Sequence, residues 1–79
     1  MRHPLPTEAA AAELGLRIRH HRLRRRMTQQ QLAEGIGVKR PQVSGWETGV
    51  KHPSLGSLLL TGKTLDVDPG ALVRGLHRL

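Results

Sequence analysis

The sequence predicts an all-α fold, a compact domain of five helices. Its 79 residues make one small domain at most, which excludes a large enzyme. Trp46 is the only aromatic residue, so a β-sandwich or barrel would lack the side chains that usually fill it. Five segments also have apolar residues at helical spacing between capping residues. These three observations together favour helices throughout.

Charge and cysteine content limit the partners and the sources of stability. Thirteen Lys and Arg against six Asp and Glu give a net charge of +7 with neutral histidines. This excess favours a polyanionic partner, such as nucleic acid or an acidic membrane surface. Cysteine is absent, which excludes disulfides and thiolate zinc sites, so packing alone must stabilise the fold. No segment approaches the roughly 20 apolar residues of a membrane span, and no secretory signal is evident.

The first helix follows a short arm. Residues 1–7 contain two prolines and no periodic apolar pattern, which predicts a flexible arm ahead of a domain over residues 8–79. Thr7 is the expected cap, and Glu8 places a carboxylate where the helix dipole favours it. Apolar residues then recur at helical spacing to about Arg25.

Two short helices are expected next. Thr28 and Gln31 have the spacing of a capping box, and Gly37 suits the left-handed position just past a helix. Pro41 is tolerated in the first turn of the following helix, which Gly49 ends. Two short helices joined by a glycine-containing turn are typical of the helix-turn-helix.

Two further helices complete the expected domain. Ser54 is a plausible cap for a helix that reaches Leu65. Gly56 and Gly62 weaken it by roughly 1 kcal/mol each, unless they are sites of close helix contact. A last short helix opens at Asp68 and Pro69. We expect its apolar residues to be Leu72, Val73 and Leu76.

The stretch TQQQLAEGIGVKRPQVSGWETG resembles the lambda-repressor and Cro-like family of helix-turn-helix domains, also called XRE-type. The helix-turn-helix unit covers residues 28–47, and the resemblance extends over residues 14–79. The matching positions begin with LGLRIR at residues 14–19. They continue with Thr28-Gln29, Leu32-Ala33, Gly37-Val38, Trp46-Glu47, Gly49, Pro53-Ser54-Leu55, Leu65 and Val67. The resemblance implies that the second helix of the unit enters the major groove of double-stranded DNA.

The resemblance also implies which residues read bases. Arg40, Gln42 and Ser44 are the expected readers, with Arg40 first because its guanidinium matches O6 and N7 of guanine. The alternative is that Arg40 binds only phosphate. Pro41 and Gly45 stand where relatives often have polar readers, so we expect either a short set of direct base contacts or a share of the specificity drawn from DNA shape.

Phosphate contacts are expected around these readers. The candidates are Arg22, Gln29, Lys39, Thr48, Lys51 and His52. For Thr48, Lys51 and His52 the alternative is a solvated loop. The resemblance further implies a structural ion pair between Arg22 and Glu47, which leaves part of the Arg22 fork for phosphate.

The remaining charged groups have simpler interpretations. Six of the ten residues from 17 to 26 are arginine, and we expect Arg17, Arg19, Arg24 and Arg25 to supply a diffuse positive field. His21 is expected to be partly buried, and Trp46 to lie in the core. No metal site, cofactor or catalytic group is expected, because no His, Cys or carboxylate recurs at ligand or triad spacing.

The leading hypothesis is a non-enzymatic, sequence-specific DNA-binding transcriptional regulator, a repressor that binds a palindromic operator as a homodimer. It is expected to be cytoplasmic, and nucleoid-associated when bound to DNA. One alternative is an antitoxin or other module whose main partner is a protein, and another is a basic membrane binder. The expected dimer residues are Leu60, Leu72, Val73, Leu76 and Leu79. The alternative is that Leu72 and Leu76 simply cover the fourth helix.

Overall fold

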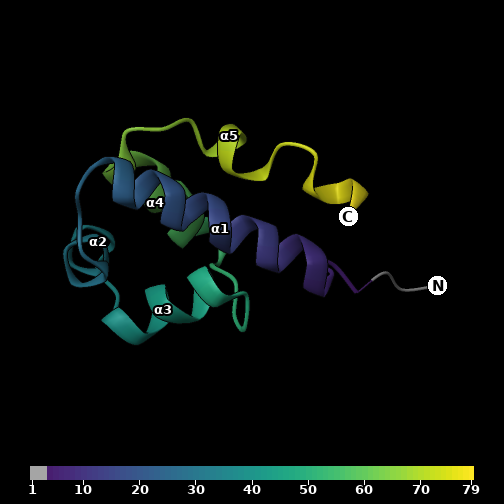
Figure 1. Ribbon diagram of the computed structural model, residues 1–79, viewed down its shortest axis with the longest axis horizontal. Coiled ribbons are helices and arrows are strands. Elements are labelled where there is room, and N and C mark those ends of the chain that lie inside the picture. Colours follow the sequence, from purple (N-terminus) through teal and green to yellow (C-terminus); the bar gives the residue numbers. More distant parts are fainter. Residues whose placement is uncertain (1–3) are drawn as a thin grey trace.

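The computed structural model describes residues 4–79. It contains α1 (Glu8–Arg24), α2 (Gln29–Ile36), α3 (Arg40–Thr48), α4 (Leu55–Leu65), α5 (Pro69–Val73) and a 3-10 turn, η1 (Leu76–Arg78). No strand occurs among these residues, so the all-α, five-helix prediction is confirmed. The long helix α1 runs through the molecule, with α2 and α3 along one side and α5 along the other (Figure 1).

Helices begin where the capping residues predict. Thr7 Oγ1 accepts a hydrogen bond from the amide of Ala10 at 3.1 Å, and Ser54 Oγ accepts one from Ser57 at 3.1 Å. Thr28 forms the full capping box with Gln31, through hydrogen bonds of 3.0 and 2.8 Å. Each cap satisfies a backbone amide that the helix itself leaves without an acceptor.

Left-handed residues end the first three helices. Gly37 (φ 88°) and Gly49 (φ 78°) follow α2 and α3, as predicted. After α1 the left-handed residue is Arg26 (φ 55°), which has a Cβ and therefore costs about 1–2 kcal/mol relative to glycine. The chain still turns sharply there into α2.

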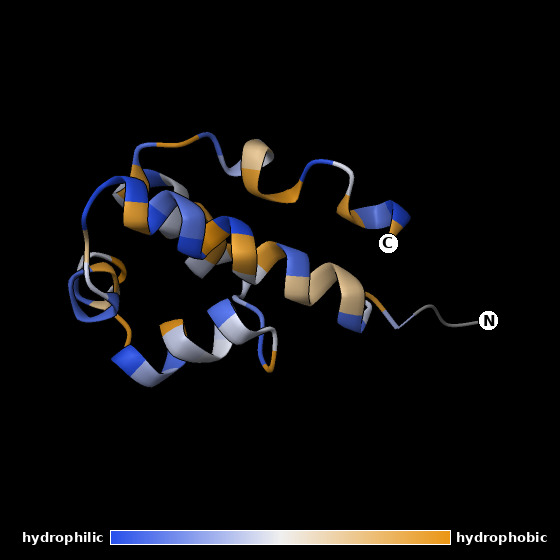
Figure 2. Cartoon of the chain, in the orientation of Figure 1, coloured by the Kyte–Doolittle hydropathy of each residue, from blue (hydrophilic) through white to orange (hydrophobic). Residues whose placement is uncertain are grey.

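The core lies between α1, the helix-turn-helix and α4. Hydrophobic and hydrophilic residues follow one another along α1 (Figure 2). Trp46 is 4% exposed, which confirms that it packs in the core. The other buried members of this cluster are Leu14, Ile18, Leu32, Ala33, Ile36, Val43, Leu65 and Leu72.

The C-terminal end differs from the prediction. Helix α5 stops at Val73, because Arg74 is extended (ψ 125°) and Gly75 is left-handed (φ 76°). Leu76 therefore lies in η1 and not in a fifth helix that continues to it. Leu72 is fully buried and Leu76 packs against the core, so both cover the domain's own interior.

The two glycines of α4 have different surroundings. A Cβ on Gly62 would lie 2.7 Å from Pro69 Cγ, so this glycine allows α4 and α5 to approach closely. A Cβ on Gly56 would meet no atom within 4 Å, so no close contact requires this glycine, and it only lowers the stability of α4.

Arg17 contradicts its predicted role in a diffuse field. Its guanidinium donates to Glu13 Oε2 at 3.0 Å and to the carbonyls of Leu72 and Arg74 at 3.2 and 2.8 Å. Arg17 thus fastens the end of α5 to α1, and its donors satisfy carbonyls that the short helix leaves free.

The ends of the described chain lie close together. Thr7 Oγ1 donates a hydrogen bond to the carbonyl of Leu79 at 3.1 Å. The arm predicted over residues 1–7 falls partly outside the described residues, whereas Leu5 and Pro6 border an apolar hollow between α1, α5 and the loop before α4. Within residues 4–79, no helix has both the length and the apolar character needed to cross a bilayer.

Candidate nucleic-acid interface

Helix α3 has one buried and one open side. Val43, Trp46 and Glu47 are buried against the rest of the domain. Arg40, Pro41, Gln42 and Thr48 are exposed, and Ser44 is half-buried. Sequence reasoning therefore placed its three candidate base readers on the part of α3 that a ligand can reach.

A buried ion pair connects α1 to the end of α3. Arg22 Nε and Nη2 donate to the two carboxylate oxygens of Glu47 at 2.6 and 2.9 Å. A third donor, Nη1, reaches the carbonyl of Met27 at 2.8 Å. Both side chains are almost fully buried, and the hydrogen bonds to Glu47 raise the pKa of Arg22 despite the opposing effect of burial. The structure brings these two predicted partners together and leaves little of the Arg22 guanidinium group exposed.

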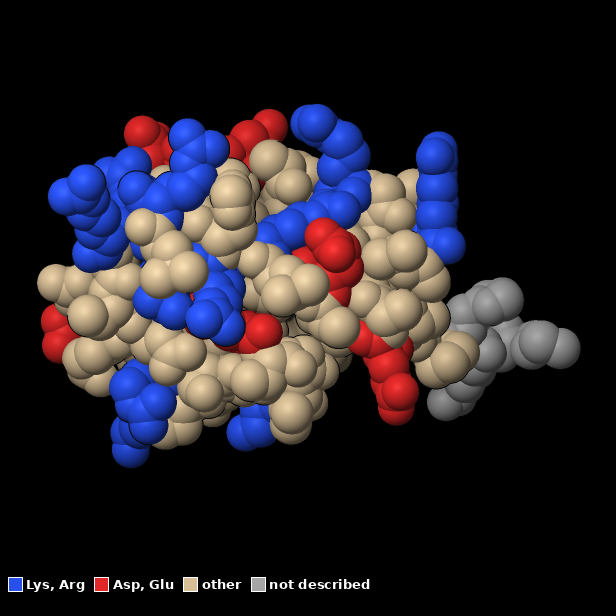
Figure 3. All heavy atoms as spheres, in the orientation of Figure 1, with Lys and Arg blue, Asp and Glu red and all other residues tan. Residues whose placement is uncertain are grey.

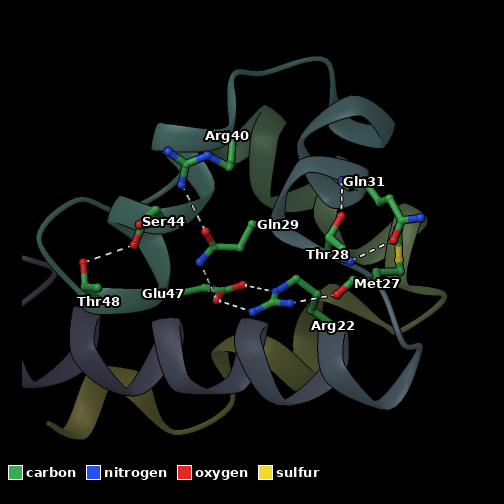
Figure 4. Close-up of polar contacts among 9 residues, drawn as sticks. All are labelled: Arg22, Met27, Thr28, Gln29, Gln31, Arg40, Ser44, Glu47 and Thr48. Carbon is green, nitrogen blue, oxygen red and sulfur yellow. Dashed lines mark hydrogen bonds and ion pairs between the residues drawn. The ribbon is translucent and has the colours of Figure 1, made fainter.

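Gln29 extends this pair to the open side of α3 (Figure 4). Its Nε2 donates to Glu47 Oε1 at 3.1 Å, and its Oε1 accepts from Arg40 Nη1 at 3.4 Å. An amide has a donor and an acceptor at its two ends, so a carboxylate on one side and a guanidinium on the other fix its orientation. A continuous polar chain thus runs from the interior to Arg40.

The start of α2 lies at this same place. In the capping box, the side chains of Thr28 and Gln31 each accept a hydrogen bond from the backbone amide of the other residue. The other amides of a first helical turn have no acceptor within the helix, and the positive end of the helix dipole lies with them. Together with Gln29, this helix terminus forms a suitable position for a phosphate.

Lys39, Gln42 and His52 lie together around a second polar feature. They border a hollow of about 480 Å³ on the flank of α3. The remaining lining residues are Val38, Trp46, Ser54 and Ser57. Lys39 is the N-cap of α3 but forms no side-chain cap, so its ammonium group is not used by the helix. The serines were not predicted as site residues, and their only sequence signal was the expected cap at Ser54.

Thr48 and Lys51 are placed by local contacts. Thr48 Oγ1 donates to the carbonyls of Ser44 and Gly45 at 3.1 and 3.2 Å, which occupies its single hydroxyl proton. The side chain of Lys51 lies over Gly45, where an added Cβ would sit 3.4 Å from Lys51 Cδ. An alanine at position 45 would therefore make ordinary van der Waals contact with the lysine side chain, which lies beside the open side of α3.

Positive charge gathers at one end of the domain. Figure 3 shows Lys and Arg side chains concentrated over the end where α1 stops and α2 lies. Arg19, Arg24, Arg25 and Arg26 are exposed in this region, and of these only Arg25 approaches an acidic group among residues 4–79, at 3.9 Å from Asp66. The positive charge of these four side chains therefore faces solvent and not the protein interior.

The histidines within residues 4–79 lie apart from one another or in pairs. No three His, Cys, Asp or Glu side chains come together within the part of the chain that the structure describes. His21 is half-buried as expected and packs edge-on to His20, with ring centroids 5.3 Å apart. Burial lowers the pKa of His21, and the nearby charges of His20 and Arg24 lower it further.

The geometry agrees with the family comparison. Residues 18–72 match the helix-turn-helix family. The chain belongs to this family, in its lambda-repressor and Cro-like branch.

Two curated relatives carry the same description. The chain is 41% identical over 61 residues to the uncharacterised HTH-type transcriptional regulator y4wC of Sinorhizobium fredii, which covers 77% of this chain and 43% of the relative. It is 32% identical over 54 residues to the uncharacterised HTH-type transcriptional regulator YqaE of Bacillus subtilis, covering 68% of this chain and 47% of the relative. The chain therefore spans about half the length of these relatives.

Solved structures share the fold over most of the chain. The P22 c2 repressor, determined in complex with a synthetic operator, superposes with a TM-score of 0.75 at 32% identity, over 78% of this chain and 94% of that one. The restriction-modification controller protein C.AhdI of Aeromonas hydrophila gives 0.78 at 33% identity, over 81% and 97%. The hypothetical transcription factor NHTF of Neisseria gives 0.78 at 25% identity, over 99% and 92%.

Proposed function

We propose that this protein is a transcriptional regulator that binds double-stranded DNA in a sequence-specific manner, with α3 in the major groove. The polar chain from the buried Arg22–Glu47 pair through Gln29 to Arg40 is the observation that carries the proposal. It holds a guanidinium at the start of an exposed helix side, where a base edge would meet it. The similarity to the P22 c2 repressor, whose structure contains a synthetic operator, supports the same role. The proposed task is binding in the cytoplasm and not catalysis.

Base reading is assigned to Arg40, Gln42 and Ser44. Arg40 is the only one of the three with a charged fork, which suits guanine and is worth about 1–3 kcal/mol of discrimination. Gln42 is exposed, whereas Ser44 is half-buried and would contact a base only at close approach. Few direct contacts leave a share of the specificity to DNA shape.

Phosphate binding is assigned to two clusters. Gln29 and the start of α2 form the first, and Lys39 with His52 form the second on the flank of α3. Lys51 extends the second cluster past the end of α3. Contacts on both sides of the reading helix would fix its register along the groove without reading sequence.

We further propose a homodimeric repressor with a palindromic operator. Two copies of α3 spaced by one turn of DNA, roughly 34–36 Å, would double the few base contacts of one domain. The exposed apolar side of α4 is the candidate interface, with Leu55 72%, Leu59 51% and Leu60 43% exposed. Leu72 is excluded from this role, because it is fully buried in its own domain.

A salt series of binding to operator-like duplexes tests DNA binding. Phosphate contacts predict that the logarithm of the affinity falls linearly with the logarithm of salt concentration, and a sequence reader adds a preference among duplexes at fixed salt. Sedimentation of the wild type and of Leu55→Gln/Leu59→Gln tests the dimer. Equal affinity for all duplexes would contradict sequence reading, and a monomer on operator DNA would contradict the dimer.

A further inference from the structure

Helix α1 has an apolar stripe on its solvent side. Residues 9, 12, 16, 19 and 23 follow one another at intervals of three and four, which places them on one side of a helix. The buried side of α1 holds Ala11, Gly15, Ile18 and Arg22. Within residues 4–79, Leu16 and Leu23 remain 58% and 52% exposed. We call Ala9, Ala12, Leu16, Arg19 and Leu23 the α1 stripe.

Uncompensated positive charge lies on the α1 stripe at Arg19. Among the described residues, Arg17, Arg22 and Arg25 each have an acidic group within 4.0 Å. Within the same part of the chain Arg19, Arg24 and Arg26 have none. Arg19 sits between the two leucines, so any surface that covers the leucines also meets its guanidinium.

This combination favours an acidic protein surface over the other occupants. DNA phosphates would use the arginines but gain nothing from the leucines between them. A second copy of the chain would bring another net charge of +7 and a second Arg19 into the contact. A membrane-surface helix needs a broad face of large apolar residues, whereas this stripe is narrow and two of its five residues are alanine. A narrow seam at three- and four-residue spacing matches the contact side of a second helix.

We propose that the α1 stripe docks an acidic amphipathic helix of a partner protein. The leucines would fit between apolar residues of that helix, Ala9 and Ala12 would permit close approach, and Arg19 would pair with a carboxylate beside the seam. From residue 9 to residue 23 the stripe is about 21 Å long, enough for four turns of a partner helix. The proposal goes beyond DNA binding and does not depend on it.

The probe is a synthetic helical peptide of about three heptads. It has leucine at positions a and d of each heptad, which form the contact seam, and glutamate at the flanking positions e and g. Its control is a peptide of the same composition whose leucines are spread around the helix. Binding to the full chain is measured by fluorescence anisotropy and mapped by amide chemical shifts. We expect the seam peptide to bind more tightly than the control and to shift amides of α1.

Variants locate the contact. Leu16→Gln/Leu23→Gln should weaken peptide binding about tenfold or more, and Arg19→Glu about threefold or more. Both leucines are exposed, so glutamine, a good helix former, should leave the fold intact. The control is Leu5→Gln, which removes a 63% exposed leucine that lies outside the α1 stripe and outside the proposed dimer interface, and it should leave peptide binding unchanged.

The proposal would be overturned if the seam peptide failed to bind or if the control peptide bound equally well. It would also be overturned if Leu16→Gln/Leu23→Gln retained full peptide affinity. Loss of self-association in this variant would assign the stripe to a second copy, and loss of binding to DNA or to anionic vesicles would assign it to those surfaces. Loss of DNA binding by Arg40→Ala with intact peptide binding would separate this proposal from the proposed function.

Discussion

Arg40 donates a hydrogen bond from Nη1 to Oε1 of Gln29 across the turn between α2 and α3, at 3.4 Å. The contact joins the first residue of α2 to the first residue of α3. Because Gln29 is itself held by the buried carboxylate of Glu47, the position of Arg40 is linked to the core. The proposed reading residue is therefore oriented before any DNA arrives.

The buried ion pair should contribute strongly to stability. Glu47→Ala leaves Arg22 buried without its carboxylate, and breaking such a pair costs about 3–5 kcal/mol. Thermal and urea unfolding measure the loss. Glu34→Ala is the control, because among residues 4–79 its carboxylate accepts one side-chain hydrogen bond, from Gln30 on the surface, and the change should alter stability by less than about 0.5 kcal/mol. If Glu47→Ala lost as little stability as Glu34→Ala, the ion pair would not stabilise the contact between α1 and α3.

The two glycines of α4 should respond to alanine in opposite directions. Gly56→Ala adds a methyl group in open space and should stabilise the domain by up to about 1 kcal/mol through helix propensity. Gly62→Ala places a Cβ 2.7 Å from Pro69 Cγ and should cost about 1–3 kcal/mol through overpacking. Urea unfolding of the two variants side by side tests the close approach of α4 and α5. Equal shifts of the same sign would refute it.

His21 should make stability depend on pH. Burial lowers its pKa in the folded state below the usual 6.5, so the unfolded chain binds the proton more readily. Stability from this group is complete above pH 6.5 and decreases as the pH falls through 6.5 toward the lower, folded pKa. His21→Gln should reduce the difference in melting temperature between neutral and mildly acidic buffer, whereas His77→Gln, at the exposed C-terminal end, should preserve it. An unchanged difference in His21→Gln would assign the pH dependence to other groups.

The starts of the helices could be predicted because their signals are local. Thr7, Thr28 and Ser54 each cap a helix through a contact three residues away, and the spacing of those residues is visible in the sequence. Gly37 and Gly49 likewise indicate the ends of α2 and α3. The central helix-turn-helix was therefore predictable within a residue or two.

Contacts between distant segments could not be predicted in the same way. Arg17 meets carbonyls 55 and 57 residues away. Its spacing of four residues from Glu13 is visible in the sequence, but these two distant contacts are not. The end of α5 depends on the left-handed Gly75, which the apolar spacing of Leu72 and Leu76 concealed. The link from Gln29 to Arg40 also requires both helices to be in place. Side-chain roles in the site thus depend on tertiary placement more than the helices do.

Selection of preferred duplexes from a random pool, with wild type, Arg40→Ala and Gln29→Ala at one salt concentration, tests the central claim most directly. The account predicts a defined wild-type site, a preference relaxed at one base pair of each half-site in Arg40→Ala, and a uniform loss of affinity with an unchanged preference in Gln29→Ala. The relaxed base pair should lose about 1–3 kcal/mol of discrimination. A wild type that enriches no sequence, or an Arg40→Ala variant that selects the same site as the wild type, would contradict the assignment of Arg40 as the base reader.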